Sequence, residues 1–284
     1  MPPLAANARM YAVAPAARDL WRRLLEWSGR KAGVPLIYVE HAAPAPLEEL
    51  WSRDDLGLAF MCGYPFARAG VIPGEQADGT PVRWAGVKPV AAPVPADPRC
   101  GGRALYWTDF VVAADAPFRS LEDTFGRRIG WTVEHSQSGF NALRHHLLRH
   151  RGGRQNLFRE SAGPLVTPRQ VVEAVLSGEI DVGPLDSYVH DLLRRFEPRT
   201  AARLRAVAST DPTPMPLLVA SAGVDPALSE RLRQALIAAR DDADMAGVLA
   251  ALGLAGFAAP EPEAYRVLLD QAAEAEAAGY PVPA

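Results

Sequence analysis

The residues best suited to chemistry lie in one short stretch, residues 130–141, which reads as an apolar strand, a turn and the beginning of a helix. The turn contains Ser136, Gln137, Ser138 and Gly139. The first backbone N–H groups of a helix lack intrahelical acceptors and the helix dipole is positive there, so such a turn can hold an oxyanion between N–H groups and hydroxyls. Alternatively, a serine simply caps the helix. The stretch alone leaves both interpretations open.

Further polar and aromatic residues stand at the ends of other predicted strands. Tyr64 and Asp186 each follow a strand, Tyr106 begins one, and His135 precedes the first serine of the turn. In open α/β sheets, ligands lie beyond the carboxyl ends of the strands. If these ends converge, they form a site for a small ligand with an oxyanion and a hydroxyl or cationic arm. The alternatives are that Asp186 caps the following helix and that the tyrosines pack in the core.

The sequence gives little support for other catalytic motifs or for a metal-binding site. The residues around Ser136 and Ser138 do not form a G-x-S-x-G nucleophile elbow, and neither dinucleotide nor P-loop glycine motifs occur. His145, His146 and His150 share a helix, but the surrounding arginines and the absence of H-E-x-x-H favour a solvated face. We therefore assign no catalytic residue, no metal site and no cofactor.

The composition narrows the class of protein. The chain has 284 residues, a net charge of −3 and 49% hydrophobic residues, enough for one large core or two lobes. The balanced charge gives no basis for a nucleic-acid partner, and no apolar run is long enough for membrane insertion. The N-terminus lacks the pattern of a secretory signal, which predicts a cytoplasmic protein as the sequence stands, or a periplasmic one if a signal was removed.

The two cysteines, Cys62 and Cys100, are too few for a disulfide scaffold. They form either one bridge or two small buried thiols.

Strands and helices alternate along most of the chain, which predicts an α/β fold. Residues 17–28 carry apolar side chains at helical spacing, and residues 56–61 form a continuous apolar strand. One or two strands are expected at 71–74 and 87–92. After residue 225 the sequence is mainly helical.

Four motifs occur in a recognisable order. They are YWTDFVV at 106–112, SLEDTFGRRI at 120–129, SQSG at 136–139 and AVLSGEIDVGPLDS at 174–187. In order and spacing they resemble the phosphonate-binding branch of the type 2 periplasmic solute-binding proteins. The likeness covers about 105–220.

The resemblance implies a two-lobed type 2 periplasmic-binding-protein-like fold of the α/β class, with a ligand cleft between lobes joined by two crossing strands. The crossings would lie near 106–110 and 208–216. Lobe 1 would comprise 1–107 and 209–284, and lobe 2 would comprise 108–208.

The resemblance also implies roles for individual residues. The serine turn and its helix N-terminus would hold the phosphonate oxygens, an aspartate would orient a donor on the ligand, and tyrosines would line the cleft. The expected ligand-binding residues are Ser136, Gln137, Ser138, Gly139, Asp186, Tyr64, Tyr106 and His135. Gln137 stands where the family usually has threonine, so we expect the site to accept a different ligand group.

The function implied is that of a non-catalytic solute-binding protein. It would capture a small phosphonate or phosphate-like anion by hinge closure. Its partners would be the ligand and the membrane subunits of an ABC transporter. The alternatives are a cytoplasmic enzyme or a ligand sensor built on the same bilobal fold.

Overall fold

The computed structural model describes residues 2–70 and 82–284, and the strand predicted at 71–74 lies outside them. The chain divides into two compact units. Unit 1 comprises Met1–Leu105 and Pro214–Arg266, and unit 2 comprises Tyr106–Thr213 and Val267–Ala284.

Unit 1 is built on a six-stranded sheet with the order β13-β4-β12-β3-β1-β2. β1 pairs in parallel with β2 and β3, while β12 pairs antiparallel with β3 and β4. The strands are β1 (Leu4–Asn7), β2 (Leu36–Tyr38), β3 (Leu56–Met61), β4 (Lys88–Pro95), β12 (Leu217–Ala220) and β13 (Leu254–Ala258). The helices are α1 (Pro15–Ala32), α2 (Leu47–Trp51), α3 (Gly63–Ala67), α8 (Pro226–Ala238) and α9 (Ala243–Leu252).

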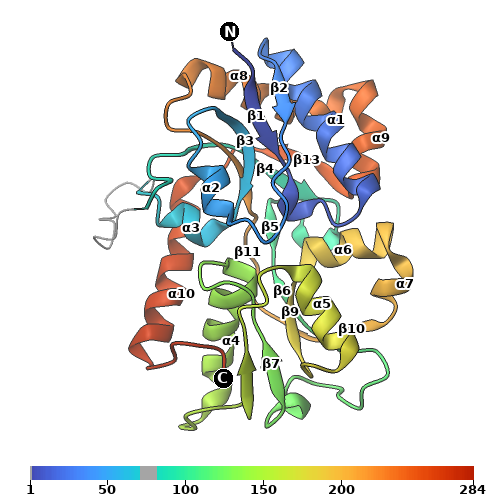
Figure 1. The fold of residues 1–284 in the computed structure, drawn as a ribbon, viewed down its shortest axis with the longest axis vertical. Coiled ribbons are helices and arrows are strands. Elements are labelled where there is room, and N and C mark those ends of the chain that lie inside the picture. The colour runs from blue at the N-terminus through green and yellow to red at the C-terminus, as the bar shows by residue number, and fades with distance from the viewer. Residues whose placement is uncertain (1, 71–81) are drawn as a thin grey trace. The chain divides into compact units, whose positions relative to one another are not determined.

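The apolar pattern of unit 1 explains how its layers pack. β3 is buried along its whole length, as a strand covered on both faces must be. The predicted helix at 17–28 is confirmed as the centre of α1, which lies beside α8 and α9 (Figure 1). Trp21 on its buried face packs edge-on against Phe60 of β3, with ring centroids 5.0 Å apart.

Unit 2 is built on an antiparallel sheet with the order β10-β6-β9. A parallel pair, β7 and β8, extends it through a bridge between Ile129 and Val182. The strands are β6 (Thr108–Ala113), β7 (Arg128–Gly130), β8 (Glu160–Ala162), β9 (Gly183–Asp186) and β10 (Leu204–Ser209). The helices are α4 (Ala142–Arg151), α5 (Pro168–Ser177), α6 (Ser187–Phe196), α7 (Pro198–Ala201) and α10 (Arg266–Ala277).

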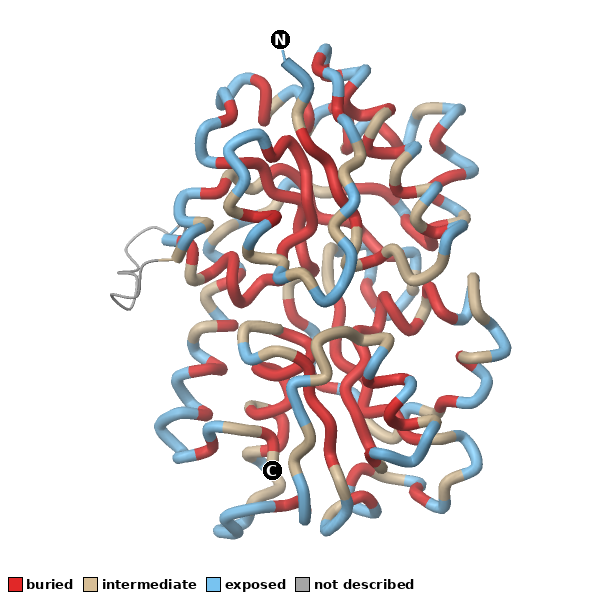
Figure 2. The backbone as a smooth tube through the Cα atoms, viewed as in Figure 1, coloured by how far each residue is buried: buried red, intermediate tan, exposed pale blue. Residues whose placement is uncertain are grey.

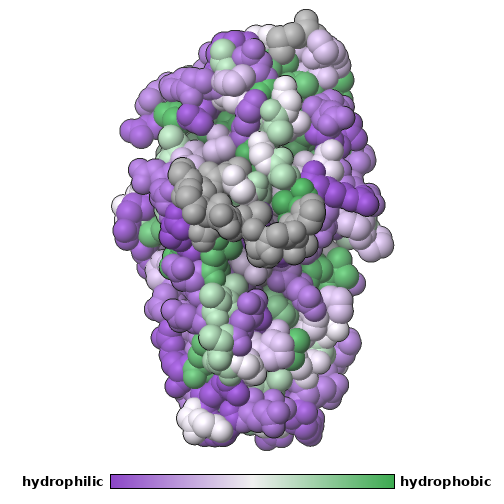
Figure 3. All heavy atoms as spheres, turned by 90° about the vertical axis from the view of Figure 1, so that its left-hand side faces the viewer, coloured by the Kyte–Doolittle hydropathy of each residue, from purple (hydrophilic) through white to green (hydrophobic). Residues whose placement is uncertain are grey.

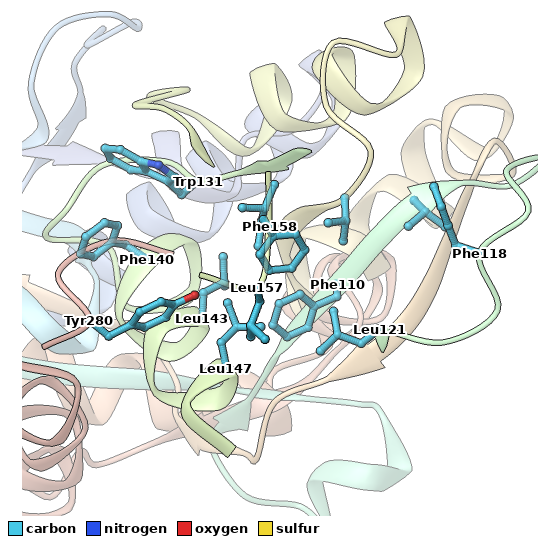
Figure 4. Packing of buried hydrophobic residues seen from close by; sticks show 13 residues of the cluster. Phe110, Phe118, Leu121, Trp131, Phe140, Leu143, Leu147, Leu157, Phe158 and Tyr280 are labelled. Carbon is cyan, nitrogen blue, oxygen red and sulfur yellow. The ribbon is translucent and has the colours of Figure 1, made fainter. Parts of the chain in front are cut away.

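The core of unit 2 joins three parts of the chain. Figure 4 shows Phe110 of β6, Leu143 and Leu147 of α4, and Tyr280 near the C-terminus within one apolar cluster. β6 and β9 are buried along almost their whole length (Figure 2). The C-terminal segment is therefore part of this core.

The chain passes between the units at three places. Two of them, at 105/106 and 213/214, lie in strands β5 (Leu105–Tyr106) and β11 (Thr213–Pro214), which pair with each other. The predicted two-lobed α/β fold with crossing strands is thus confirmed.

The third passage, at 266/267, corrects the predicted division of the chain. Residues 267–284 were expected in lobe 1, but they belong to unit 2. The backbone N–H of Leu157 donates to Ala284 O (2.9 Å) and Arg151 Nη1 donates to Ala278 O (2.8 Å). Since Tyr280 also enters the unit 2 core, packing holds this segment there.

Few large hydrophobic side chains of the described residues are exposed. Figure 3 shows one face on which hydrophilic residues predominate, and Ile37 and Val267 are the exposed large hydrophobics of the described residues. In the same residues, no helix combines the length and apolar character that a bilayer crossing requires. Cys62 and Cys100 are both buried free thiols, so the alternative of a bridge is excluded.

Candidate functional site

The serine turn forms the first turn of the helix that continues into α4. Its residues Gln137–Asn141 are π-helical, and the N–H of Asn141 donates to Ser136 O five residues earlier (3.0 Å). Ser136 is the N-cap, and its hydroxyl oxygen accepts from the N–H of Gly139 (3.0 Å). The capping interpretation is therefore correct for Ser136. A π turn inside an α-helix is rare and is often found at functional sites.

Capping leaves donors available at this helix end. No described residue accepts a hydrogen bond from the backbone N–H of Gln137 or Ser138, although both residues are buried. The hydroxyl of Ser136 accepts one bond and still carries a proton that it can donate. Buried N–H groups without acceptors are costly, and an anion at the positive end of the helix would satisfy them. Capping and anion binding are thus compatible in this turn.

A threonine of β6 connects the turn to the sheet. Thr108 Oγ1 donates to Ser138 O (2.9 Å), and the Thr108 side chain is buried. Thr108 stands directly opposite Asp186 in the antiparallel register of β6 and β9. Directly opposed residues share a face of a sheet, so Ser138, Thr108 and Asp186 lie on the same side of unit 2.

Asp186 ends β9 and caps α6. Its Oδ1 accepts from the N–H groups of Tyr188 (2.8 Å) and Val189 (3.0 Å). The next residue, Ser187, exchanges hydrogen bonds with Trp107, which places Tyr106 beside the same strand end. The capping interpretation is therefore correct for Asp186 too, and the cap fixes its carboxylate.

We expected the side chain of Gln137 to contact the ligand, but it points into the protein. Its side chain is fully buried and bonded to Asn141 and Gln271, each at 2.9 Å. The structure therefore corrects the idea that this amide replaces a hydroxyl in the site. The backbone N–H of Gln137 has no acceptor among the described residues.

The remaining predicted residues divide between the units. Seven of the eight belong to unit 2: Tyr106, His135, Ser136, Gln137, Ser138, Gly139 and Asp186. His135 is partly buried in the turn that precedes the cap. Tyr64 belongs to unit 1, where it lies in α3 with the guanidinium of Arg68 5.8 Å from its ring centroid.

The sequence interpretation missed a buried polar cluster behind the site. Asp109 of β6 accepts hydrogen bonds through Oδ2 from His190 (2.7 Å) and through Oδ1 from Ser209 (2.7 Å) and Trp107 Nε1 (3.0 Å). Burial alone would raise the pKa of Asp109, but the bonds from His190, Ser209 and Trp107 outweigh it and the pKa is lowered. An acidic residue inside an apolar strand was the available signal, because buried charges require partners.

The three histidines of α4 contact different neighbours. Within 2–70 and 82–284, no cluster of three or more His, Cys, Asp or Glu side chains could hold a metal ion. His145 contacts Glu274 (2.9 Å) and His150 contacts Glu122 (3.3 Å). His146 packs on Phe110, with ring centroids 5.2 Å apart.

The burial of His146 predicts an acid-sensitive stability. Burial, then the charges of Arg149 and His150, lower its pKa from 6.5 to about 4. As the pH falls, the unfolded chain binds this proton before the folded chain does. The contribution of neutral His146 to the free energy of unfolding is therefore fully present above about pH 6.5, and it declines by about 2–3 kcal/mol toward pH 4. Urea unfolding at pH 7 and pH 4.5 measures this difference.

The variant His146→Leu should remove most of that difference, because the titrating group is gone. His145→Leu is the matched control: it leaves the buried imidazole of His146 in place, so the decline in stability toward pH 4 should persist. An equal pH dependence in wild type and His146→Leu would contradict the assignment.

The family of the chain follows from a sequence comparison. A family model described as "ABC transporter, phosphonate, periplasmic substrate-binding protein" matches residues 14–265. The chain belongs to this family. The resemblance expected from the four motifs is thus confirmed, and the chain is identified with a substrate-binding component of transport. No curated protein sequence matches it.

Solved structures share the fold of this phosphonate substrate-binding family member. A binding protein component of an ABC phosphonate transporter from Pseudomonas aeruginosa has a TM-score of 0.79 at 17% identity, over 98% of this chain and 88% of that one. PhnD1 from Prochlorococcus marinus, in complex with methylphosphonate, has a TM-score of 0.72 at 16% identity, over 96% and 98%. XAC2383 from Xanthomonas citri, bound to ATP, has a TM-score of 0.62 at 20% identity, over 98% of both chains. At these identities the likeness shows the fold alone.

Proposed function

We propose that the chain captures a small phosphonate or phosphate-like oxyanion at the turn 136–139 of unit 2. The observation that carries the proposal is a pair of backbone N–H groups, those of the buried residues Gln137 and Ser138, which have no acceptor among the described residues. They stand at the N-terminus of a helix that runs to Arg151, where an anion is favoured. Membership of the phosphonate-binding family supports this ligand class.

The surrounding residues suggest how the ligand is oriented. The hydroxyls of Ser136 and Ser138 add donors to the two N–H groups, so the turn can surround a tetrahedral group. Asp186 lies on the same face and would accept a hydrogen bond from a hydroxyl or ammonium on the rest of the ligand. Tyr106 would limit the size of that part, and His135 would border the turn.

We also propose that the chain binds its ligand without changing it. It would close around the ligand by hinge motion and deliver it in the periplasm to the membrane subunits of an ABC transporter. The family description supports this role, because it names a substrate-binding component of such a transporter. Phosphorus NMR of methylphosphonate after prolonged incubation with the protein should show the unchanged compound, whereas a new phosphorus signal would favour an enzyme.

The binding step is tested by calorimetric titration with methylphosphonate, phosphate, methanesulfonate and ATP. We expect binding of at least one phosphorus oxyanion. Ser138→Ala should weaken it about tenfold, because a hydrogen bond to a charged group is lost. Ser177→Ala is the matched control, since Ser177 lies at the far end of α5 and donates only to Ala174 O within its own helix. No binding of any of these ligands, or equal affinity in Ser138→Ala, would contradict the proposal.

A further inference from the structure

The side chain of Gln137 belongs to a buried amide network that reaches the C-terminal helix. Its Nε2 donates to Gln271 Oε1 of α10 (2.9 Å). Its Oε1 accepts from Asn141 Nδ2 (2.9 Å), and the same nitrogen donates to Leu268 O of α10 (2.9 Å). Gln137 and Asn141 are fully buried and Gln271 is 8% exposed.

The donors and acceptors of this network fit in one arrangement. Asn141 Nδ2 has two N–H groups, and both are used. Gln137 must therefore present its oxygen to Asn141 and its nitrogen to Gln271. Rotating the Gln137 amide by half a turn would bring two donors together at Asn141 and two acceptors together at Gln271. A buried hydrogen-bond network of this kind restrains the side chains that form it.

The network acts on the turn that carries the free N–H groups. Gln137 and Asn141 are the first and last residues of the π turn, and their side-chain bond spans it. The backbone N–H of Ala142 donates to Gln137 O, so the same residue is held through its main chain. The direction of the Gln137 and Ser138 N–H groups therefore depends on where Gln271 holds the Gln137 side chain.

We propose that Gln271 is a positioning residue for the anion site. Acting through Gln137, it keeps the π turn in the geometry that points the two N–H groups at the ligand. The inference rests on the proposed function and adds a determinant from α10, a segment that lies beyond the residues matched by the family model.

Other contacts allow the effect of Gln271 to be separated from the docking of α10. Glu274, one turn further along, contacts His145 (2.9 Å), and Tyr280 packs in the unit 2 core. Arg151 lies over the Tyr280 ring, 4.8 Å from its centroid. α10 should therefore remain in place when Gln271 loses its amide.

The test compares Gln137→Met, Gln271→Met and the double variant with wild type, and uses Glu274→Ala as the matched control on the same helix. Three quantities are measured: the affinity for methylphosphonate and phosphate, the thermal midpoint, and hydrogen exchange of the 137–141 amides without ligand. We expect Gln271→Met to weaken binding about tenfold and to speed exchange in the turn. Glu274→Ala should change neither.

The double variant separates positioning from simple stability. The double variant has neither an unpaired amide at 137 nor one at 271, although Asn141 Nδ2 still loses its acceptor, as it does in Gln137→Met. It should therefore lose less of the thermal midpoint than the two single variants together, while its affinity stays low. If affinity recovers together with stability, the role is structural and the proposal fails. If Gln137→Met weakens binding and Gln271→Met does not, Gln137 contacts the ligand directly and the proposal also fails.

If the proposed function is wrong, the wild type binds neither methylphosphonate nor phosphate. Hydrogen exchange of the 137–141 amides then still tests whether Gln271 controls the turn. Faster exchange in Gln271→Met than in Glu274→Ala supports control of the turn by Gln271, and equal exchange overturns it.

Discussion

Replacing Gly139 with alanine is expected to weaken oxyanion binding about a hundredfold and to lower the free energy of unfolding by about 1–3 kcal/mol. A Cβ atom at this position would lie 1.8 Å from Thr132 Oγ1 and 2.9 Å from Thr132 Cβ. The two segments cannot simply separate, because the N–H of Thr132 donates to Gly139 O (3.1 Å). The turn must therefore shift, and the N–H groups of Gln137 and Ser138 shift with it.

Calorimetric titration and urea unfolding of the same samples measure both effects. Adding Thr132→Ala to Gly139→Ala removes the shortest contact, so the double variant should recover part of the affinity and stability. Gly247→Ala in α9 is the matched control, because nothing lies within 4 Å of a Cβ atom there. Wild-type affinity in Gly139→Ala would show that the turn does not bind the anion.

Local signals along the chain predicted much of the fold. Thr167 followed by Pro168 indicated a helix start, and the Thr167 hydroxyl accepts from Gln170 N–H as the N-cap of α5. Gly178 was expected to end that helix and does so with φ 74°. Such features depend on neighbours within a few residues, which the sequence displays directly.

The candidate site was predictable only in part, because its geometry depends on distant residues. The capping of the helix by Ser136 follows from local sequence. The π turn instead contacts Thr108 at the carbonyl of Ser138 and Gln271 at the side chain of Gln137, and these hydrogen bonds span 30 and 134 positions. Family resemblance suggested a ligand contact for the side chain of Gln137, whereas packing directs it into the protein.

The sequence did not reveal that residues 267–284 belong to unit 2, because this assignment also depends on distant residues. The amphipathic pattern of α10 predicts a helix with one apolar face, but it does not state which unit covers that face. In the structure, Tyr280 anchors the segment to unit 2, since it packs in the unit 2 core and lies against Arg151. The partners of an apolar face are set by the complete fold.

The largest loss of stability is expected from His190→Leu, which should lower the free energy of unfolding at pH 7 by about 3 kcal/mol. The side chains of Asp109 and His190 are only 5% and 2% exposed. Leucine removes the 2.7 Å hydrogen bond and leaves the buried carboxylate with Ser209 and Trp107 as partners. Because Asp109 adjoins Thr108, loss of this bond also loosens the strand that holds the turn.

The pH dependence of this loss distinguishes an uncompensated charge from poorer packing. In wild type the lowered pKa of Asp109 stabilises the fold above its unfolded value near 3.8, and this contribution is lost as the pH falls through the folded pKa. Without His190, fewer bonds oppose burial and the pKa should rise, so the variant loses stability as the pH increases. The deficit relative to wild type should therefore shrink from pH 7 to pH 5 in urea unfolding.

Asp109→Asn with His190→Leu provides the control, because asparagine keeps an acceptor for Ser209 and Trp107 but carries no charge. This pair of changes should cost less than His190→Leu alone. Because both variants lack His190, the difference in stability between them reports the carboxylate of Asp109 and should shrink from pH 7 to pH 5. A deficit in His190→Leu that stays constant with pH, or a double variant as unstable as the single one, would assign the loss to packing instead. The result therefore decides whether the bond from His190 is what allows a carboxylate to stand in this buried strand beside the turn.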